Sequence, residues 1–385
     1  MTRTLVVQTA WLGDVLLATP LLEALAARHG PVDVLVTPAA APLVATHPAV
    51  ATVLTYDKRG RERGGVALWR KARALRARRY DLAVLAQGSF RSGLLARLAG
   101  IPRRVGFADT AAARWCTERR ARPAGHEAER LLALAGAVSP PDPGPREVVD
   151  PAEAGPRPPS VAEATGASAR FTGRSRPRAR FSGIHRARAS IVHEAPIPDA
   201  RGPALSLALT DDDHATAAAA LAQAGITGPF VALAPGSARA TKRWPSYREL
   251  AALLAREMAV VVIGEPADGW GTVADLTGLP LRASAAVLAR AAAAVVNDSA
   301  PLHLAQAVGT PVVALFGPTH PRLGFGPRGP RDVTLGLDLA CRPCSTHGGP
   351  RCPLRHHRCL RELTVATVRD AVRRVLALEE VSWVS

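Results

Sequence analysis

Short apolar runs alternate with longer amphipathic segments along the first third of the chain. Four of these runs predict strands, at 5–7, 32–36, 51–55 and 82–86. Three helices are predicted between or after them, at 15–28, 65–78 and 92–99. Strands separated by helices of ~10–15 residues are typical of βαβ units, which build a parallel sheet. This alternation restricts the chain to the α/β class.

The same alternation returns in the second half of the chain. Strands are predicted at 230–234, 260–263, 294–296 and 312–316. Helices are predicted at 211–224, 246–256, 283–292, 300–308 and 364–378. A chain of 385 residues is too long for one core, since domains usually hold ~100–200 residues. We therefore expect two doubly wound, Rossmann-like domains that face a central cleft, with ligand at the carboxyl ends of the strands.

The regular pattern fails in the middle of the chain. Twelve of the 33 prolines lie between 140 and 203, and 170–188 carries seven arginines without one acid. Such composition predicts a linker or disordered insertion, although a stretch of non-native reading frame would look similar. The expected organisation is an N-terminal domain at 1–139, the Pro/Arg-rich segment at 140–204, a C-terminal domain at 205–363, and a helix within 364–385 that packs back on the N-terminal domain.

Charge and hydropathy limit the partners and the location. Lys and Arg number 49 against 32 Asp and Glu, which gives a net charge of +17 and favours anionic partners. Part of this excess fits the Arg/Ala bias of a GC-rich genome, and 4% aromatic residues argue against a stacking surface for single-stranded nucleic acid. No apolar run approaches the ~18 residues of a membrane span. Asp14 interrupts any signal-peptide core, so we expect a cytoplasmic protein.

The first candidate site is the turn between the first strand and the first helix, residues 9–14. Gly13 allows close approach of a backbone or ligand, and Asp14 stands where the helix opens. An N-cap aspartate that stabilises the helix dipole explains Asp14 equally well. No GxGxxG is present, which argues against a nicotinamide-type pyrophosphate loop.

Two further candidate sites lie in the second half. The loop 235–245 follows a strand and carries Ser237, Thr241 and Lys242, the hydroxyls and cation expected around a phosphate. A solvated basic loop is the alternative. Residues 297–303 open a helix with Asp298 or Ser299 as its cap, and with Pro301 and His303 in its first turn. Capping and anion binding are compatible at such a helix start.

Four segments, in this order, resemble glycosyltransferase family 9, the lipopolysaccharide heptosyltransferases. They are LVVQTAWLGDVLLATPLLEAL, YDLAVLAQGSFRSGLLARLAGIPRRVGF, LAPGSARATKRWP and VVNDSAPLHLAQAVGTPVVALFGPT. The second segment is most similar to the heptosyltransferase II branch. The resemblance implies a GT-B fold and inverting transfer of L-glycero-D-manno-heptose from ADP-heptose to heptosyl-Kdo2-lipid A. It also implies an enzyme at the periphery of the inner membrane, with an anionic lipid-linked acceptor and no nucleic-acid partner.

The resemblance also assigns roles to residues. It makes Asp14 the catalytic base that takes the proton of the acceptor hydroxyl. The donor-binding positions that it implies are Ser237, Thr241, Lys242, Asp268, Asp298, Ser299 and His303. Asp268 is the expected ribose contact, with Glu265 as a rival. The acceptor-side candidates are Gly13, Ser89 and Arg91. Because cations and helix-start N–H groups can stabilise the leaving diphosphate, no cofactor or divalent metal is required.

A Cys/His-rich loop at 341–359 departs from the simplest family pattern. Its cysteines are Cys341, Cys344, Cys352 and Cys359, with three histidines interleaved. Four cysteines in nineteen residues suggest a structural zinc site, but a second CxxC is missing, and a reduced structural loop is the alternative.

Two other functions remain open at this level. One is a family 9 transferase with a different nucleotide-sugar donor or acceptor. The other is a basic nucleic-acid- or metal-binding protein built on a degenerate transferase core, against which the intact Gly13-Asp14, Thr241-Lys242 and Asp298-Ser299 pairs argue.

Overall fold

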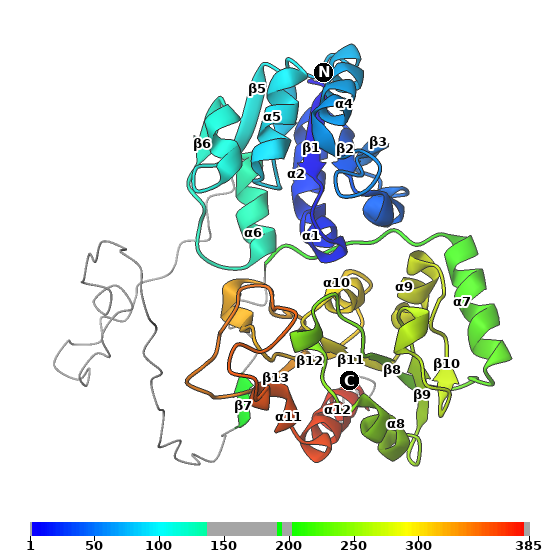
Figure 1. Ribbon diagram of the computed structural model, residues 1–385. Coiled ribbons are helices and arrows are strands. Elements are labelled where there is room, and N and C mark those ends of the chain that lie inside the picture. The colour runs from blue at the N-terminus through cyan, green and yellow to red at the C-terminus, as the bar shows by residue number, and fades with distance from the viewer. Residues whose placement is uncertain (1, 137–190, 195–201, 381–385) are drawn as a thin grey trace, which may run out of the picture. The chain divides into compact units, whose positions relative to one another are not determined.

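The computed structural model of the chain describes residues 2–136, 191–194 and 202–380 (Figure 1). These residues belong to one compact unit that contains two β-sheets. Most of the predicted Pro/Arg-rich segment, including the arginine run at 170–188, lies outside the described residues.

The N-terminal sheet has six parallel strands in the order β3-β2-β1-β4-β5-β6. Its strands are β1 (Thr4–Gln8), β2 (Val32–Val36), β3 (Val50–Thr55), β4 (Leu82–Val84), β5 (Arg103–Phe107) and β6 (Glu118–Arg120). The helices of this half are α1 (Leu12–Leu17), α2 (Thr19–His29), α3 (Ala41–Val44), α4 (Gly64–Ala77), α5 (Phe90–Leu98) and α6 (Glu127–Leu132), with short 3-10 turns η1 (Pro38–Ala40), η2 (Ala111–Trp115) and η3 (Ala133–Ala135). This strand order is that of a doubly wound fold.

Alternate residues of β1 enter two different cores. Val6 packs in the core formed with α1, α2 and α6, whereas Leu5 and Val7 pack against α4 and α5 on the opposite face. Because successive side chains of a strand point to opposite faces, a continuous apolar strand signals a sheet covered on both sides.

The second sheet has the order β10-β9-β8-β11-β12-β13-β7. Its strands are β7 (Ile191–Glu194), β8 (Phe230–Ala234), β9 (Ala259–Val262), β10 (Ala274–Asp275), β11 (Ala293–Asn297), β12 (Val312–Leu315) and β13 (Val333–Leu337). Its helices are α7 (Asp211–Gln223), α8 (Tyr247–Leu254), α9 (Leu281–Ala289), α10 (Ala300–Ala307), α11 (Arg358–Arg361) and α12 (Val365–Glu380), with 3-10 turns η5 (Ala240–Lys242), η6 (Pro266–Asp268) and η7 (Pro321–Leu323). The fold class predicted from the alternation is confirmed.

Two expectations about the organisation were wrong. Residues 191–194, expected within the linker, form β7, which pairs antiparallel with β13 and closes an edge of the second sheet. The C-terminal helix α12 does not pack back on the N-terminal domain: Val368, Val372 and Val375 lie in the core under the second sheet. Its contacts are with β11, β12, β13 and α8. The apolar side of α12 thus helps to cover one face of the second sheet, together with residues of α8 such as Leu250 and Leu254.

The predicted helix 15–28 forms earlier and is interrupted. It is divided into α1 and α2 at Ala18, just before Pro20, whose missing N–H cannot continue the hydrogen-bond ladder. Asp14 therefore occupies the third residue of a short first helix rather than its cap. Within the described residues, no helix combines the length and apolar character needed to cross a bilayer.

Candidate active site

Both sheets carry their candidate residues where the strand order changes direction, between β1 and β4 and between β8 and β11. Loops beyond the carboxyl ends of such strands form the ligand-binding crevice of doubly wound sheets. At the first of these points the hydroxyl of Thr9, after β1, donates to Oε1 of Gln87, after β4, at 2.6 Å. The chemistry of the chain is thus concentrated at the two places that the topology favours.

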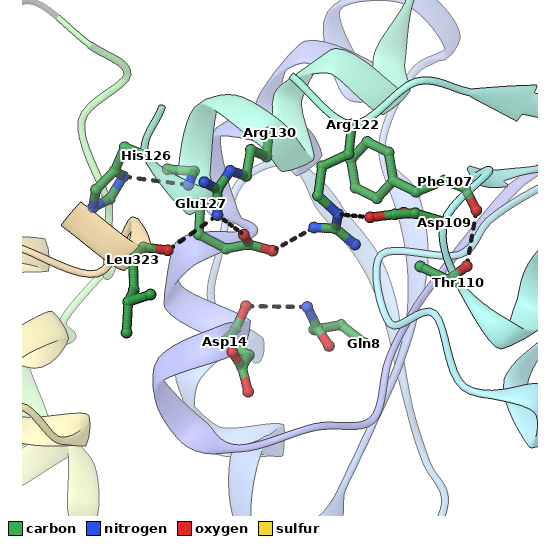
Figure 2. Close-up of polar contacts among 11 residues, drawn as sticks. Gln8, Asp14, Phe107, Asp109, Thr110, Arg122, His126, Glu127, Arg130 and Leu323 are labelled. Atoms are coloured by element: carbon green, nitrogen blue, oxygen red, sulfur yellow. Dashed lines mark hydrogen bonds and ion pairs between the residues drawn. The ribbon is translucent and has the colours of Figure 1, made fainter. Parts of the chain in front are cut away.

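Asp14 is half-buried in the first turn of α1. Its Oδ2 accepts a hydrogen bond from the backbone N–H of Trp11 at 3.0 Å, and Nε2 of Gln8 donates to the backbone carbonyl of Asp14 at 3.3 Å (Figure 2). The carboxylate therefore serves the helix start as well as facing the site. An ionised carboxyl group has about four acceptor positions, so this contact leaves capacity for a reacting proton.

Gly13 lies against His303 of α10. A Cβ atom at position 13 would come within 2.6 Å of the imidazole Cδ2, so the closeness of this contact requires glycine. His303 is 5% exposed. Burial lowers its pKa, which the nearby carboxylates of Asp298 and Asp14 oppose. The carboxylates of Asp14 and Asp298, one from each half of the chain, therefore lie within electrostatic reach of one imidazole.

Lys242 and Asp298 form a close ion pair. Nζ of Lys242 lies 2.6 Å from Oδ2 of Asp298, and the two side chains are 13% and 7% exposed. The hydroxyl of Thr319 donates to the same carboxylate oxygen at 2.6 Å. The pair brings together the loops after β8 and β11, which the sequence had suggested only as separate sites.

The start of α10 is tied to the loop after β8 by polar side chains. Nδ2 of the buried Asn297 donates to the carbonyl of Pro235 at 2.8 Å, and its Oδ1 accepts from the backbone N–H of Trp244 at 3.2 Å. The hydroxyl of Ser299 donates to the carbonyl of Gly236 at 3.2 Å. Ser299 is the N-cap residue of α10 but makes no side-chain cap hydrogen bond, because its hydroxyl is turned towards this loop.

Ser237 and Asp268 flank the same loop. Oγ of Ser237 accepts from the backbone N–H of Arg239 at 3.3 Å. The carboxylate of Asp268 is packed against Gly236, where a Cβ would lie 2.3 Å from its Oδ2. Its rival Glu265 is exposed. The structure therefore brings Asp268, and not Glu265, to the loop after β8.

Thr241 has a contact that the sequence did not predict. Its hydroxyl and the backbone of Gly349 exchange hydrogen bonds of 2.9 Å, and the imidazole Nε2 of His357 lies 2.8 Å from the carbonyl of Thr241. A Cβ at Gly348 would lie 3.0 Å from Cγ of Lys242. The Cys/His-rich loop 341–359 thus packs against the loop 235–245 and holds it in place, and we call it the brace.

The cysteines of this brace do not support the zinc hypothesis. Among the residues that the structure describes, no three His, Cys, Asp or Glu side chains gather in a group that could hold a metal ion. Burial raises the pKa of Cys359 to about 11, and nearby thiols also raise the pKa of Cys344 beyond the effect of its burial. Cys341, Cys344, Cys352 and Cys359 are free thiols. The structure thus gives no support for zinc in the part of the chain that it describes, and the reduced structural loop stays a prediction.

The acceptor-side candidates Ser89 and Arg91 lie at the start of α5, and Arg91 contacts the loop after β3. Ser89 caps α5, its Oγ accepting from the backbone N–H of Ser92 at 3.2 Å. Nη2 of Arg91 donates to the carbonyls of Glu62 and Gly64 at 3.0 and 2.9 Å, and its Nε donates to the hydroxyl of Tyr56 at 2.6 Å. Arg91 therefore holds the loop 56–64 in place.

Lys58, in that loop, is a site residue that the sequence analysis missed. Its Nζ donates to Oγ1 of Thr9 at 3.0 Å and to Oε1 of Gln87 at 2.7 Å. Burial, with the charges of Arg59 and Arg91, lowers the pKa of Lys58 to about 8. The sequence did contain a signal for Lys58, because it follows the predicted strand 51–55 by three residues. Residues at the carboxyl ends of parallel strands lie along the edge of the sheet where ligands bind.

Trp11 and Arg122 were also missed. The Cζ atoms of Arg59 and Arg239 lie 4.2 and 5.6 Å from the Trp11 ring centroid, a cation–π arrangement that joins both candidate loops. Arg122 lies 4.1 Å from the ring of Phe107. Figure 2 shows a chain of ion pairs that links Asp109, Arg122, Glu127 and Arg130. This chain runs through α6, which contacts α1, the helix of Asp14.

Two doubly wound sheets, with a carboxylate at one switch point and a cationic, hydroxyl-bearing loop at the other, fit the two Rossmann-like domains of a glycosyltransferase of the GT-B type. The chain belongs to glycosyltransferase family 9 (heptosyltransferase), whose sequence profile matches residues 68–142 and 191–351, more than half of the chain. The family resemblance seen in the sequence is confirmed.

Individual relatives agree with this assignment. The chain is 37% identical over 138 residues to lipopolysaccharide heptosyltransferase 1 of Pseudomonas aeruginosa, a match that covers 32% of this chain and 38% of that protein. The structure of ADP-heptose LPS heptosyltransferase II of E. coli is similar with a TM-score of 0.66 and 22% identity, over 98% of this chain and 100% of that one. E. coli heptosyltransferase WaaC with ADP-2-deoxy-2-fluoro heptose gives a TM-score of 0.58 at 21% identity, over 97% and 99%. The two structural similarities concern the fold.

Proposed function

We propose that this chain is an inverting heptosyltransferase that moves L-glycero-D-manno-heptose from ADP-heptose to a heptosyl-Kdo2-lipid A acceptor in lipopolysaccharide core synthesis. The observation that carries this proposal is the contact of Gly13 with His303, which holds the Asp14 turn beside the Lys242–Asp298 pair. It joins a general-base candidate to a diphosphate-binding candidate. The similar solved structures are of an ADP-heptose LPS heptosyltransferase II and of a heptosyltransferase with ADP-2-deoxy-2-fluoro heptose, which supports ADP-heptose as the donor.

Asp14 is the general base in this proposal. The acceptor hydroxyl oxygen attacks the anomeric carbon, its proton passes to the Asp14 carboxylate, and the bond from the anomeric carbon to the phosphate oxygen breaks. ADP leaves with the electron pair of that bond, and attack from the opposite face inverts the anomeric centre. The hydrogen bond from Trp11 N–H keeps the carboxylate at the turn during this transfer.

The charge on the departing diphosphate is met by the loops after β8 and β11. Lys242 supplies a cation, and Ser237 and Ser299 bring hydroxyls to the same loops, so that donors and charge are preorganised where negative charge develops. The ion pair with Asp298 positions the ammonium group of Lys242. Burial keeps His303 neutral at physiological pH by lowering its pKa, so it interacts with the donor as an uncharged imidazole.

The N-terminal sheet serves the acceptor and the second sheet serves the donor. Lys58 and Arg59 place positive charge beside the Asp14 turn, and an anionic acceptor such as phosphorylated lipid A complements that charge. Such an acceptor is embedded in a bilayer, so the enzyme works at the membrane surface.

Turnover with purified substrates tests the proposal. ADP-heptose with heptosyl-Kdo2-lipid A should give a product one heptose heavier by mass spectrometry, with inverted anomeric configuration by NMR. ADP-glucose and UDP-sugars serve as donor controls, and Kdo2-lipid A without heptose serves as the acceptor control. Faster transfer from a control donor or to the control acceptor would instead identify a family 9 transferase of different specificity.

A further inference from the structure

Exposed large apolar side chains are concentrated in the N-terminal half of the chain. Five of the six that the structure describes belong to it: Trp11, Val66, Trp69, Phe90 and Leu98, with Leu354 as the sixth. Val66 and Trp69 lie one turn apart on α4 and are 66% and 56% exposed. A half-exposed tryptophan beside an exposed valine on one helix marks an interaction surface more strongly than a single apolar residue does.

Arginines surround these two residues. Val66, Arg70 and Arg73 follow one another at spacings of four and three residues, which places them along one side of the helix, with Trp69 next to them. The Cζ atom of Arg73 lies 5.7 Å from the Trp69 ring centroid. We call the exposed residues Arg63, Val66, Trp69, Arg70 and Arg73 the α4 face.

The opposite side of α4 packs on the sheet. Leu68, Ala72 and Leu75 are buried in the core beneath α4 and α5. The ion pairs at this helix are made by Lys71 with Glu62 at 2.7 Å and by Arg78 with Asp33 at 3.2 Å.

The arginines of the α4 face are left for an outside partner. Arg63, Arg70 and Arg73 form no salt bridge within the ranges that the structure describes. The 22 residues from 58 to 79 hold ten cations and one acid. The charge of the face is therefore unbalanced by the protein itself.

The α4 face begins at the edge of the sheet where the acceptor is expected. α4 starts at Gly64, directly after the loop that carries Lys58 and Arg59, and Arg59 lies against Trp11 beside the Asp14 turn. Residues 66 to 73 extend about 10 Å along the helix. A partner bound here would therefore lie next to the loop that reaches the Asp14 turn.

We propose that the α4 face is a membrane-docking surface whose partner is an anionic phospholipid bilayer. The proposal rests on the proposed function, since it supplies the place where an enzyme with a lipid-linked acceptor meets the membrane. Tryptophan settles at the headgroup level of bilayers, and arginine is attracted to anionic headgroups. Docked in this way, the enzyme presents the Asp14 edge to a sugar that projects from the bilayer.

Vesicle co-sedimentation tests this surface with the full chain and without any nucleotide sugar. Wild type should bind phosphatidylethanolamine–phosphatidylglycerol vesicles and bind phosphatidylcholine vesicles far less. Arg70→Gln with Arg73→Gln should lower the partition coefficient about 20- to 30-fold, because each cation near the surface contributes about fivefold. Val66→Ser with Trp69→Ser should lower it at least about tenfold, because both apolar side chains are lost.

Matched controls lie in the second half of the chain. Arg256→Gln with Arg290→Gln removes the same charge from exposed positions, and Leu354→Ser removes a side chain that is 60% exposed. Both controls should bind vesicles as wild type does. Equal losses in the controls and in the α4 variants would overturn the proposal, as would equal binding of wild type to both kinds of vesicle.

Two further outcomes would assign the face to another partner and overturn the proposal. One is a wild-type dimer that Val66→Ser with Trp69→Ser converts to a monomer in light scattering while vesicle binding stays unchanged. The other is DNA binding that the arginine variant abolishes, again with vesicle binding unchanged. Turnover with ADP-heptose and a soluble delipidated acceptor is measured separately. Vesicle binding without heptose transfer would contradict only the proposed function. Heptose transfer without vesicle binding would contradict only the docking surface.

Discussion

Gly13 and His303 are separated by most of the chain, yet they touch so closely that a Cβ atom on Gly13 would lie 2.6 Å from the imidazole. The contact links the turn that carries Asp14 to the helix that begins after Asp298. Because His303 is buried, the imidazole has little room to yield to a larger residue.

Gly13→Ala should therefore disturb both stability and activity. The added methyl group forces His303 to move, and overpacking of this kind costs about 1–3 kcal/mol of unfolding free energy. Urea denaturation and kcat of the variant measure the two effects. Gly65→Ala is the matched control, since a Cβ at Gly65 meets nothing within 4 Å. Wild-type stability and kcat in Gly13→Ala would mean that the contact is not required.

Asp14→Asn should nearly abolish turnover while ADP affinity stays close to that of wild type. The amide keeps the shape of the side chain but cannot take a proton, and a base contributes mainly in the transition state. Steady-state kinetics and ADP titration calorimetry separate the two effects. Asp211→Asn, at an exposed first-turn position of α7, serves as the control. A variant that keeps more than about a tenth of wild-type kcat would exclude Asp14 as the essential base.

Lys242→Ala should weaken ADP binding about tenfold or more, because a charge-assisted hydrogen bond to phosphate is lost. The substitution also leaves Asp298 buried without its cation, so Lys242→Ala with Asp298→Asn is needed to separate the two causes. Lys71→Ala removes a paired lysine far from the donor loops and should leave ADP affinity unchanged. If calorimetry finds the same ADP affinity in Lys242→Ala, in the double variant and in Lys71→Ala, Lys242 does not bind the diphosphate.

Transfer should persist in the presence of a chelator. Lys242 and the hydroxyls of its loop are proposed to meet the charge of the diphosphate, so no divalent ion is needed for that purpose. Turnover before and after EDTA treatment measures this directly. A loss of activity that magnesium restores would show that the protein groups are insufficient.

Lys58 should make stability rise with pH between about 8 and about 10.5. Its pKa is about 8 in the folded protein, because of burial and the charges of Arg59 and Arg91, and lies near its ordinary value when unfolded. Between those values the unfolded chain binds the extra proton, so raising the pH favours the folded state. The free energy of unfolding of wild type, minus that of Lys58→Met, should increase from about pH 7.5 to about pH 9.5. If this difference in unfolding free energy does not change with pH, the pKa of Lys58 is not lowered in the folded protein.

Local patterns in the sequence predicted the framework well. The strands at 32–36 and 230–234 form with those limits as β2 and β8. A short apolar run between turn residues can bury all its side chains as a central strand of a sheet covered on both faces. The division of the first helix at Ala18 was missed, although Pro20 was the signal for it.

Contacts between distant segments left no such signal. The hydrogen bonds of Thr241 with Gly349 join residues 108 positions apart, and either residue alone looks like part of an ordinary loop. The same holds for Arg239 and Trp11, which meet only when both sheets have formed. The family resemblance suggested which residues belong to the site, but their mutual arrangement depends on tertiary packing.

The brace formed by the loop 341–359 has a thermodynamic consequence. The loop contacts Thr241 and Lys242 through Gly348, Gly349 and the imidazole of His357. Cys352 lies between Gly349 and His357 in the sequence. If ADP binds the braced arrangement of this loop more tightly than a loosened one, linkage requires that ADP also favours the braced segment to the same extent. The thiols of this loop then become reporters of donor binding, and we expect their rate of alkylation to fall as ADP is added.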